Sequence, residues 1–168
     1  QFETAKNILL YSWFSFRFIP VAELTAIMCL EYALRIKTNG EIRGLKQMMT
    51  YAVEVGWWKN ENFSHWHYIQ AIEKDRRRLN EGIEKITGRK IKHPEKNVEY
   101  AASLSRKLTF IRNNYAHGSS TLAPGGYHVL VECCEAINLL FDKGAVYQAK
   151  VWRILEPSVV SYVTYDRL

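Results

Sequence analysis

The sequence has few cysteines, and their spacing excludes the sites that cysteines usually build. The 168 residues include three of them, Cys29, Cys133 and Cys134. No Cys-x-x-Cys pair occurs, and adjacent residues of a helix point in different directions, so neither a disulfide framework nor a zinc site is expected. We interpret all three as small core residues of a protein in a reducing compartment. This predicts a cytoplasmic location, no metal and no cofactor.

Long hydrophobic runs are missing as well. The most apolar stretch, Ile8 to Ile19, is shorter than a membrane span and contains Arg17. No signal peptide, repeat or low-complexity segment is recognisable. Hydrophobic residues nevertheless make up 48% of the chain and aromatic residues 13%, which argues against disorder and allows a real core. We therefore expect one domain over residues 1–168 that does not interact with membranes.

The charge balance is mildly basic, with 23 Lys and Arg against 17 Asp and Glu, which gives a net charge of +6. Such a balance permits a nucleic acid or another polyanion as partner without demanding one.

Helical periodicity runs through most of the chain. It predicts helices over Phe2–Phe14, Val21–Thr38, Glu41–Val55, Phe63–Thr87, Glu95–Ala116 and Tyr127–Phe141, with glycines 40, 56 and 118 as helix stops. The β-branched and aromatic segment Val159 to Tyr165 is expected to form a short strand or an extended arm. The predicted fold class is all-α: an antiparallel bundle of about five helices. Its core covers residues 21–141, and residues 142–168 form an extended C-terminal tail.

The expected core follows from the apolar positions of these helices. The Val21–Thr38 helix is apolar on almost every face and is predicted to be central and buried. Three further helices carry an apolar stripe. In Phe63–Thr87 it consists of Trp66, Ile69, Ile72, Leu79, Ile83 and Ile86. In Glu95–Ala116 it consists of Val98, Ala101, Leu104, Leu108, Ile111 and Tyr115, and in Tyr127–Phe141 of Leu130, Cys133, Cys134, Ile137 and Leu140.

The most informative segment ends the helix that runs up to Ala116. It reads Arg112-Asn113-Asn114-Tyr115-Ala116-His117, followed by Gly118. It places a permanent cation and a group that titrates near neutral pH at one helix terminus, and a metal-free ribonuclease needs both. Asn113 and His117 share a helix face, so the amide can hydrogen-bond the imidazole, and Gly118 suits a left-handed turn. The alternative is structural: Arg112 caps carbonyls and His117 fills a surface notch.

Two other features are expected to converge on this helix end. Gly125 and Gly126 lead into a helix N-terminus, where free N–H groups favour a phosphate, although the glycines equally suit a simple turn. Glu31 and Arg35 form an i, i+4 pair in an apolar helix. Glu31 is expected either to hold Arg112 from across the bundle or to lie in a narrow solvated strip with Arg35.

The remaining candidates are weaker. His65 and His67 are two residues apart and face different ways on a helix, so we interpret them as surface and core residues and not as metal ligands. The run Arg76, Arg77 and Arg78 suits contact with an RNA backbone, or else forms a solvated charged face. His93 has no assigned role. His128, near the glycine loop, is a weaker candidate for the site.

The chain resembles the HEPN superfamily, whose signature is an Arg, four to six residues and a His late in an all-helical bundle. The stretches AIMCLEYALR, YAVEVGWW and IRNNYAHG are together similar to bacterial members, and the resemblance covers most of Val21 to Phe141. It implies a homodimer whose paired motifs form a metal-independent RNA endonuclease, often in toxin–antitoxin, abortive-infection or other defence systems. Arg112 and His117 would be catalytic, with Asn113, Asn114, Tyr115 and Glu31 supporting them.

Three functional hypotheses follow. The first is a metal-independent endoribonuclease that acts on RNA as a homodimer, with an antitoxin or regulatory protein as a candidate further partner. A dimer is also what the chemistry needs, because one chain offers one well-placed His and the reaction needs both a base and an acid. The second is a catalytically silent module of the same type that binds nucleotide, RNA or a protein partner. The third is a plain helical dimerisation domain whose motif is only a helix cap.

Overall fold

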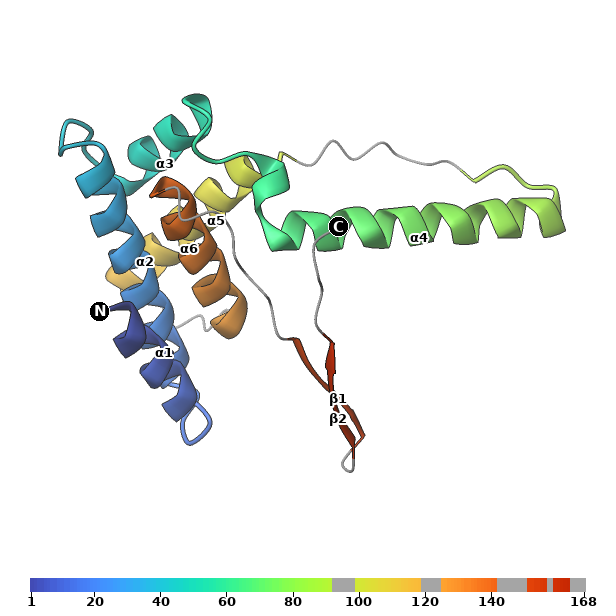
Figure 1. The fold of residues 1–168 in the computed structure, drawn as a ribbon, viewed down its shortest axis with the longest axis horizontal. Helices are drawn as coiled ribbons and strands as arrows, with labels where there is room; N and C mark the ends of the chain where they lie inside the picture. Colours follow the sequence, from blue (N-terminus) through green and yellow to red (C-terminus); the bar gives the residue numbers. More distant parts are fainter. Residues whose placement is uncertain (92–98, 119–124, 142–150, 157–158, 164–168) are drawn as a thin grey trace.

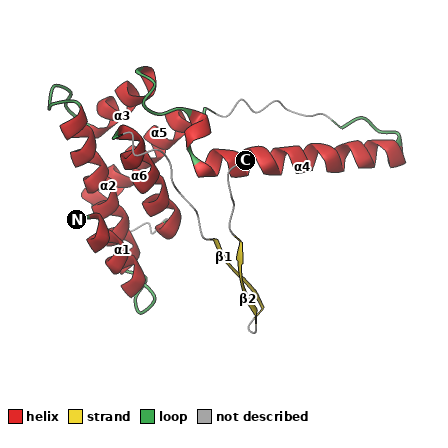
Figure 2. Ribbon diagram, in the orientation of Figure 1, coloured by secondary structure: helices red, strands yellow, loops and turns green. Residues whose placement is uncertain are grey.

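The computed structural model describes residues 1–91, 99–118, 125–141, 151–156 and 159–163, the last two ranges for the backbone only. Its helices are α1 (Phe2–Tyr11), α2 (Phe18–Lys37), α3 (Leu45–Glu54), the short 3-10 helix η1 (Asn60–Asn62), α4 (Ser64–Thr87), α5 (Tyr100–Ala116) and α6 (Gly126–Leu140). The predicted all-α class is confirmed, with six α-helices in the described ranges where about five were expected (Figure 2).

Helix α2 is the centre of the body. It packs most extensively against α1 and α6, and it also contacts α3 and α5 (Figure 1). Its buried side is built mostly from small and branched residues: Ala22, Ala26, Ile27, Leu30, Ala33 and Leu34. Small residues let neighbouring helices approach closely while Ile and Leu fill the space between them. Around α2, the predicted stripes of α5 and α6 supply part of the remaining core, including Leu104, Leu108, Cys133 and Leu140, and α3 adds Leu45, Met48, Met49 and Ala52.

Glycine ends the helices where the sequence predicts it. Gly40, Gly56 and Gly118 have φ values of +73°, +76° and +73°, a left-handed conformation that only glycine adopts at little cost. The start of α3 was expected at Glu41 and is wrong by four residues. Gly44 has a φ of +89°, so regular helix begins only at Leu45.

Helix α2 is not buried on every side, and this prediction is wrong. Its buried positions lie on one face, whereas Val21, Met28, Tyr32 and Ile36 on the opposite face are exposed. The exposed fractions of Met28 and Tyr32 are 59% and 61%. These four residues, here called the α2 stripe, recur at helical spacing, so they form one continuous apolar surface.

Helix α4 leaves the body as an arm (Figure 1). Trp66 and Ile69 at its root still pack against the core, but no residue of α4 is buried. The apolar series in this helix therefore does not complete the bundle as expected. Its outer members, Ile72, Leu79, Ile83 and Ile86, are exposed.

The C-terminal segment contains an antiparallel hairpin of β1 (Val151–Glu156) and β2 (Val159–Val163). Val151 pairs with Val163 and Arg153 with Ser161, and the register shifts between Ile154 and Glu156. The strand expected at Val159 is thus present up to Val163, and the expected residues beyond it lie outside the described ranges.

Of the three cysteines predicted to lie in the core, only Cys133 does. Cys29 and Cys134 are half-buried, and no disulfide joins the three. Burial raises the pKa of the Cys133 thiol well above its ordinary value, which keeps it protonated and unreactive. Within the described ranges, no group of three potential ligands is placed to hold a metal ion. The helices found there are also too short or too polar to cross a bilayer.

Candidate functional site

The motif lies at the exposed C-terminal end of α5. Ala116 is the last helical residue, and His117 caps the helix through a backbone hydrogen bond from its N–H to the carbonyl of Asn113 at 3.0 Å. The left-handed Gly118 then turns the chain, as predicted, with its N–H donating to the carbonyl of Tyr115 at 3.2 Å. Ile111 and Tyr115 face the core on the same helix, so α5 fixes the backbone from which Arg112 and His117 project.

Arg112 is half-exposed and lies against α2. Its Nε is 4.0 Å from Oε2 of Glu31, and the same carboxylate accepts a 3.1 Å hydrogen bond from Arg35. The structure therefore brings Glu31 and Arg112 together across the two helices, while Arg35 itself reaches solvent. Two guanidinium groups share one carboxylate, which orients Arg112 and leaves net positive charge at the surface.

The predicted Asn113–His117 hydrogen bond is not formed. Oδ1 of Asn113 instead accepts a hydrogen bond from Nη1 of Arg112 at 3.4 Å. The His117 side chain is exposed and makes no hydrogen bond within the described part of the chain. Asn114, the next supporting candidate, is half-buried. The arrangement leaves the imidazole accessible to an incoming molecule.

The buried carboxyl group of Glu23 lies behind the motif and was not predicted from the sequence. Tyr115 donates a 2.6 Å hydrogen bond from its hydroxyl to Oε2 of Glu23, which is fully buried on α2. The other oxygen, Oε1, has no hydrogen-bond partner within the described ranges. Burial raises the pKa of Glu23 above its ordinary value, although the hydrogen bond from Tyr115 and the nearby backbone N–H groups of Gly126 and Gly125 oppose this shift. The Tyr115 hydroxyl also has a raised pKa, through burial and this carboxylate, so it stays a neutral donor.

The glycine pair has a structural reason of its own. A Cβ at Gly125 would lie 2.9 Å from Cγ2 of Val129 and 3.0 Å from Oε1 of Glu23, too close for any larger residue. Gly126 is buried and has a φ of +33°. The Glu23 carboxyl group thus already lies at the N-terminus of α6. Phosphate binding at Gly125 and Gly126 remains a prediction, and it must accommodate this carboxylate.

Replacing Glu23 by glutamine is expected to change how stability depends on pH. Because the folded state raises the pKa of Glu23, its contribution to stability is complete below about pH 4.5 and is lost as the pH rises through the raised value. Each unit by which the pKa is raised corresponds to about 1.4 kcal/mol. Urea titrations at several pH values should show the wild type losing stability relative to Glu23→Gln as the pH rises above that range. Parallel pH profiles for the two proteins would contradict the assignment.

Apolar surface adjoins the motif. Met28 lies one turn before Glu31 on α2, so the α2 stripe borders the carboxylate that holds Arg112. On α5, Phe110 is exposed and has the i, i+3 and i+7 spacing to Asn113 and His117 that places all three on one helix face. Exposed apolar surface of this kind marks an interaction site more often than a free surface.

A second polar cluster, the Glu132 network, joins α5 to α6. Nζ of Lys107 lies 2.8 and 2.7 Å from the two oxygens of the buried Glu132, and the Tyr100 hydroxyl donates to Oε1 at 3.1 Å. The ring of His65 lies 5.6 Å from Tyr100 and 6.3 Å from His128, and burial lowers the pKa of His65. Lys107 compensates the carboxylate, so we interpret the network as a link between the helices. The sequence signal that could have predicted this network is a glutamate within an apolar helix, the same signal that selected Glu31.

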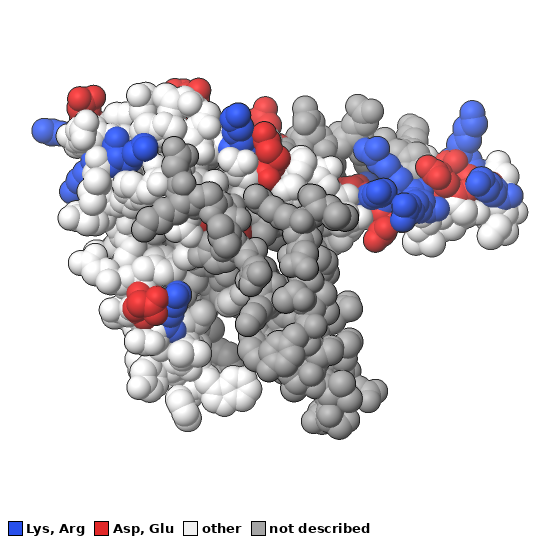
Figure 3. All heavy atoms as spheres, in the orientation of Figure 1, with Lys and Arg blue, Asp and Glu red and all other residues white. Residues whose placement is uncertain are grey.

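The other sequence candidates lie away from the motif. Arg76 forms a 2.6 Å ion pair with Glu73, and Nη1 of Arg78 is 3.8 Å from Asp75, so much of the arginine run on the α4 arm is neutralised within the helix (Figure 3). Contact of this run with RNA remains a prediction.

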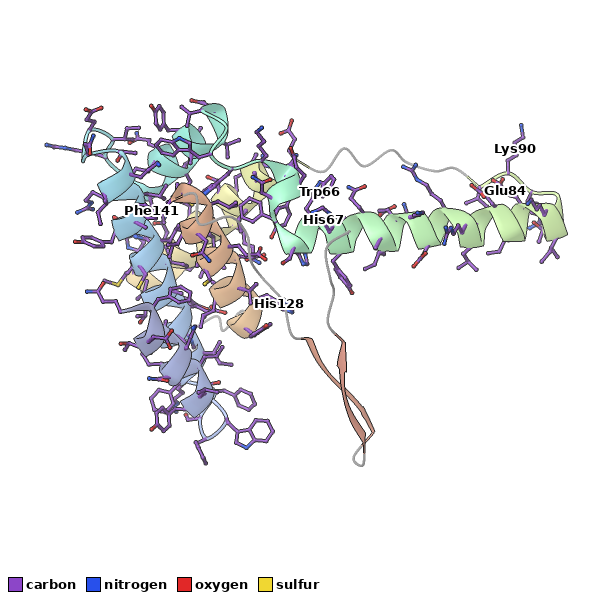
Figure 4. All side chains as sticks on the ribbon, viewed as in Figure 1. Trp66, His67, Glu84, Lys90, His128 and Phe141 are labelled. Atoms are coloured by element: carbon purple, nitrogen blue, oxygen red, sulfur yellow. The ribbon has the colours of Figure 1, made fainter. Side chains whose placement is uncertain are left out.

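The other histidines of the described residues lie apart from His117 in the fold, and a role for His128 stays a prediction. His67 lies at the root of α4 and its Nε2 is 2.7 Å from the Glu61 carbonyl (Figure 4). His128 is exposed on the first turn of α6. His93 lies outside the described residues.

Comparisons with known protein families, with curated proteins and with solved structures find no match to this chain. The geometry of the site is therefore the basis for any function assigned to it.

Proposed function

We propose that the chain is a metal-independent RNA endonuclease of the HEPN type that acts as a homodimer. The observation that carries this proposal is that the end of α5 presents an exposed His117 and a half-exposed Arg112, next to apolar surface that the described part of the chain does not cover. The Arg112 side chain is held by Glu31, whereas His117 stays accessible. A cytoplasmic location and a role in a bacterial toxin or defence system belong to the same proposal.

The chemistry needs two chains. Attack of a ribose 2′-OH on the adjacent phosphate requires a base to accept the hydroxyl proton, an acid to protonate the leaving 5′-oxygen, and positive charge on the pentavalent phosphorane. His117 supplies one proton-transfer group per chain. A two-fold axis beside the motif would bring two His117 imidazoles and two Arg112 guanidinium groups around one phosphate. Arginine suits the phosphate because its planar fork donates two parallel hydrogen bonds.

The α2 stripe is the surface through which we expect the two copies to pack. Two-fold dimers use the same patch on both subunits, so a self-complementary apolar face next to the active group is what a shared site requires. Because the stripe borders Glu31, its burial would also exclude water from around Arg112. Exclusion of water strengthens the electrostatic stabilisation of the phosphorane.

Cleavage of RNA in the presence of EDTA tests the proposal. The purified chain is expected to cut bulk single-stranded RNA at the same rate with and without EDTA, because proton transfer and charge stabilisation come from side chains alone. The products should carry a 2′,3′-cyclic phosphate and a 5′-hydroxyl, since the 2′-OH is the nucleophile. Mass spectrometry of the fragments identifies both ends. Specific activity should fall on dilution, as the homodimer dissociates.

RNA binding without cleavage would instead support a catalytically silent module of the same type, which includes regulation by a protein partner such as an antitoxin. Cleavage that stops in EDTA, or activity that is independent of dilution in a monomeric protein, would contradict the mechanism proposed here.

A further inference from the structure

The α4 arm carries an apolar stripe that its own chain leaves exposed within the described ranges. Helix α4 is about 36 Å long at 1.5 Å per residue, and none of its residues is buried. The exposed fractions of Leu79 and Ile86 are 64% and 86%. An amphipathic helix of this length gains its stability mainly by packing its apolar face against something. The stripe therefore indicates an interaction surface.

The spacing of the stripe is that of a coiled coil. Ile69, Arg76 and Ile83 are separated by seven residues and take the first apolar position of three heptads, called a. Ile72, Leu79 and Ile86 follow each of them by three residues and take the second apolar position, called d. A repeat of seven selects another helix as the occupant, because the slight mismatch with 3.6 residues per turn is removed only when two helices wind around each other.

We propose that the occupant is α4 of a second copy of this chain, and that the two arms pair in antiparallel orientation. In this register each a residue of one arm lies opposite a d residue of the other. Ile72 faces Ile83 of the second copy, and Ile86 lies opposite the remaining exposed side of Ile69, which also packs against its own core. The two-fold axis passes between Arg76 and Leu79. The same surface serves both copies, as an isologous interface requires.

Arg76 determines the orientation. A parallel pair would place the two Arg76 side chains opposite each other in one core layer, where two like charges repel at low dielectric. The antiparallel pair places each Arg76 opposite Leu79 of the second copy instead. Its guanidinium already pairs with Glu73 at 2.6 Å, so the charge enters the interface compensated while its aliphatic stem covers the leucine.

The positions that flank the stripe accept this register. Glu73 would lie beside Asn80 of the second arm, and Asp75 beside Gly82, so no two like charges meet along either edge. Arg77 and Arg78 point away from the stripe. The bodies would lie at opposite ends of the paired arms, because each body joins its arm at Ser64 (Figure 1). Neither Arg112 nor His117 takes part, so this interface is separate from the dimer proposed for the motif.

Opposite charges at position 79 test both the pairing and its direction. In the antiparallel pair, Leu79→Lys puts a second cation against Arg76 of the other copy and is expected to weaken association about tenfold or more. Leu79→Glu puts a carboxylate there and should associate more strongly than Leu79→Lys. Gln70→Lys adds the same side chain on the opposite face of α4 and should associate as the wild type does. Sedimentation velocity of the full chain at equal concentrations measures all four proteins.

The expected result is that Leu79→Lys lowers the mass of the assembly to that held by the motif dimer alone, while Leu79→Glu and Gln70→Lys keep the mass of the wild type. Equal disruption by both charges at position 79 would overturn the antiparallel register, and an unchanged mass in Leu79→Lys would overturn the pairing itself. Circular dichroism of each variant reports whether the chain still folds. The sedimentation assay needs no RNA, so its result can be interpreted even if the protein does not cleave RNA. If the protein cleaves RNA but Leu79→Lys has the wild-type mass, only the pairing of the arms is refuted.

Discussion

Replacement of His117 by alanine is expected to lower the rate of RNA cleavage about 100- to 10,000-fold, the range that general acid–base catalysis by one side chain contributes. In a paired site the substitution removes both proton-transfer groups at once, because each chain supplies one. The side chain is exposed and bonded to no other described side chain, so its loss should leave the thermal midpoint nearly unchanged. His67→Ala is the matched control, because His67 is also exposed but lies at the root of α4. It should leave cleavage intact.

Substitution of Arg112 should lower the cleavage rate as much as loss of His117, and a conservative substitution there should also be costly. We expect Arg112→Ala to abolish most cleavage, and Arg112→Lys to remain impaired because an ammonium group cannot reproduce the fork. Asn113→Ala should cost less, since its amide contacts Arg112 and not the reacting atoms. Arg106, an exposed arginine on the same helix that donates to Ser103, provides the control for loss of one positive charge.

The outcome that contradicts this assignment is equally clear. If His117→Ala unfolds the chain, or if cleavage persists in both variants, the motif is a helix cap and not a catalytic pair. Unfolding is followed by circular dichroism under the conditions of the cleavage assay. Loss of cleavage with retained RNA binding in Arg112→Lys, by contrast, would place the arginine at the phosphorane and not at the ground-state phosphate.

The helices were predictable because their signals are local. Apolar spacing located all six, and glycine at positions 40, 56 and 118 located three of their ends. The periodicity predicts that a helix has an apolar face, but it does not predict which surface packs against that face. The stripe on α4 has the same spacing whether it packs within the bundle or projects from it, and α2 is apolar on a face that the described residues leave exposed. Both errors concern contacts between segments distant in sequence.

In the candidate site, too, the local features could be predicted from the sequence and the contacts between distant segments could not. The order of residues at the end of α5 could be read from the sequence, including the left-handed turn at Gly118. The contact of Glu31 with Arg112 and its pairing with Arg35 were two open alternatives, and the packing of α2 on α5 gives Glu31 both partners, Arg35 at 3.1 Å and Arg112 at 4.0 Å. Tyr115 and Glu23 are 92 positions apart, and nothing local indicates that a tyrosine of the motif donates to that carboxylate. A charged residue within an apolar helix indicates a buried polar contact. Glu23 and Glu132 are such residues, but they were not selected as candidates from the sequence.

The adjacent residues Trp57 and Trp58 show how large a difference the sequence cannot resolve. Both follow Gly56, and neither has a helical phase that would say which one faces inward. In the structure Trp58 is fully buried, donates from Nε1 to the carbonyl of Ala136 at 3.0 Å, and contacts the ring of Phe63. Trp57 is half-buried against the Tyr51 ring.

Trp58→Ala is therefore expected to destabilise the protein by about 3 to 5 kcal/mol, the usual cost of removing a buried tryptophan side chain. For a chain of this size that corresponds to a fall in the thermal midpoint of about 6 to 20 °C. Trp57→Ala is the matched control and should cost about 1 to 2 kcal/mol, since it loses one edge-to-face ring contact and the Lys37 ammonium 5.3 Å from the ring centre.

Trp58 joins the segment between α3 and α4 to α6, so its loss should loosen the root of the α4 arm before the end of α5. Urea denaturation followed by circular dichroism gives both free energies, and hydrogen exchange at the start of α4 gives the order of loosening. Equal losses in the two variants, or a larger loss for Trp57→Ala, would show that α6 is not anchored through Trp58. Cleavage by the Trp58→Ala protein at temperatures where it stays folded should match the wild type, because no atom of Trp58 contacts Arg112 or His117.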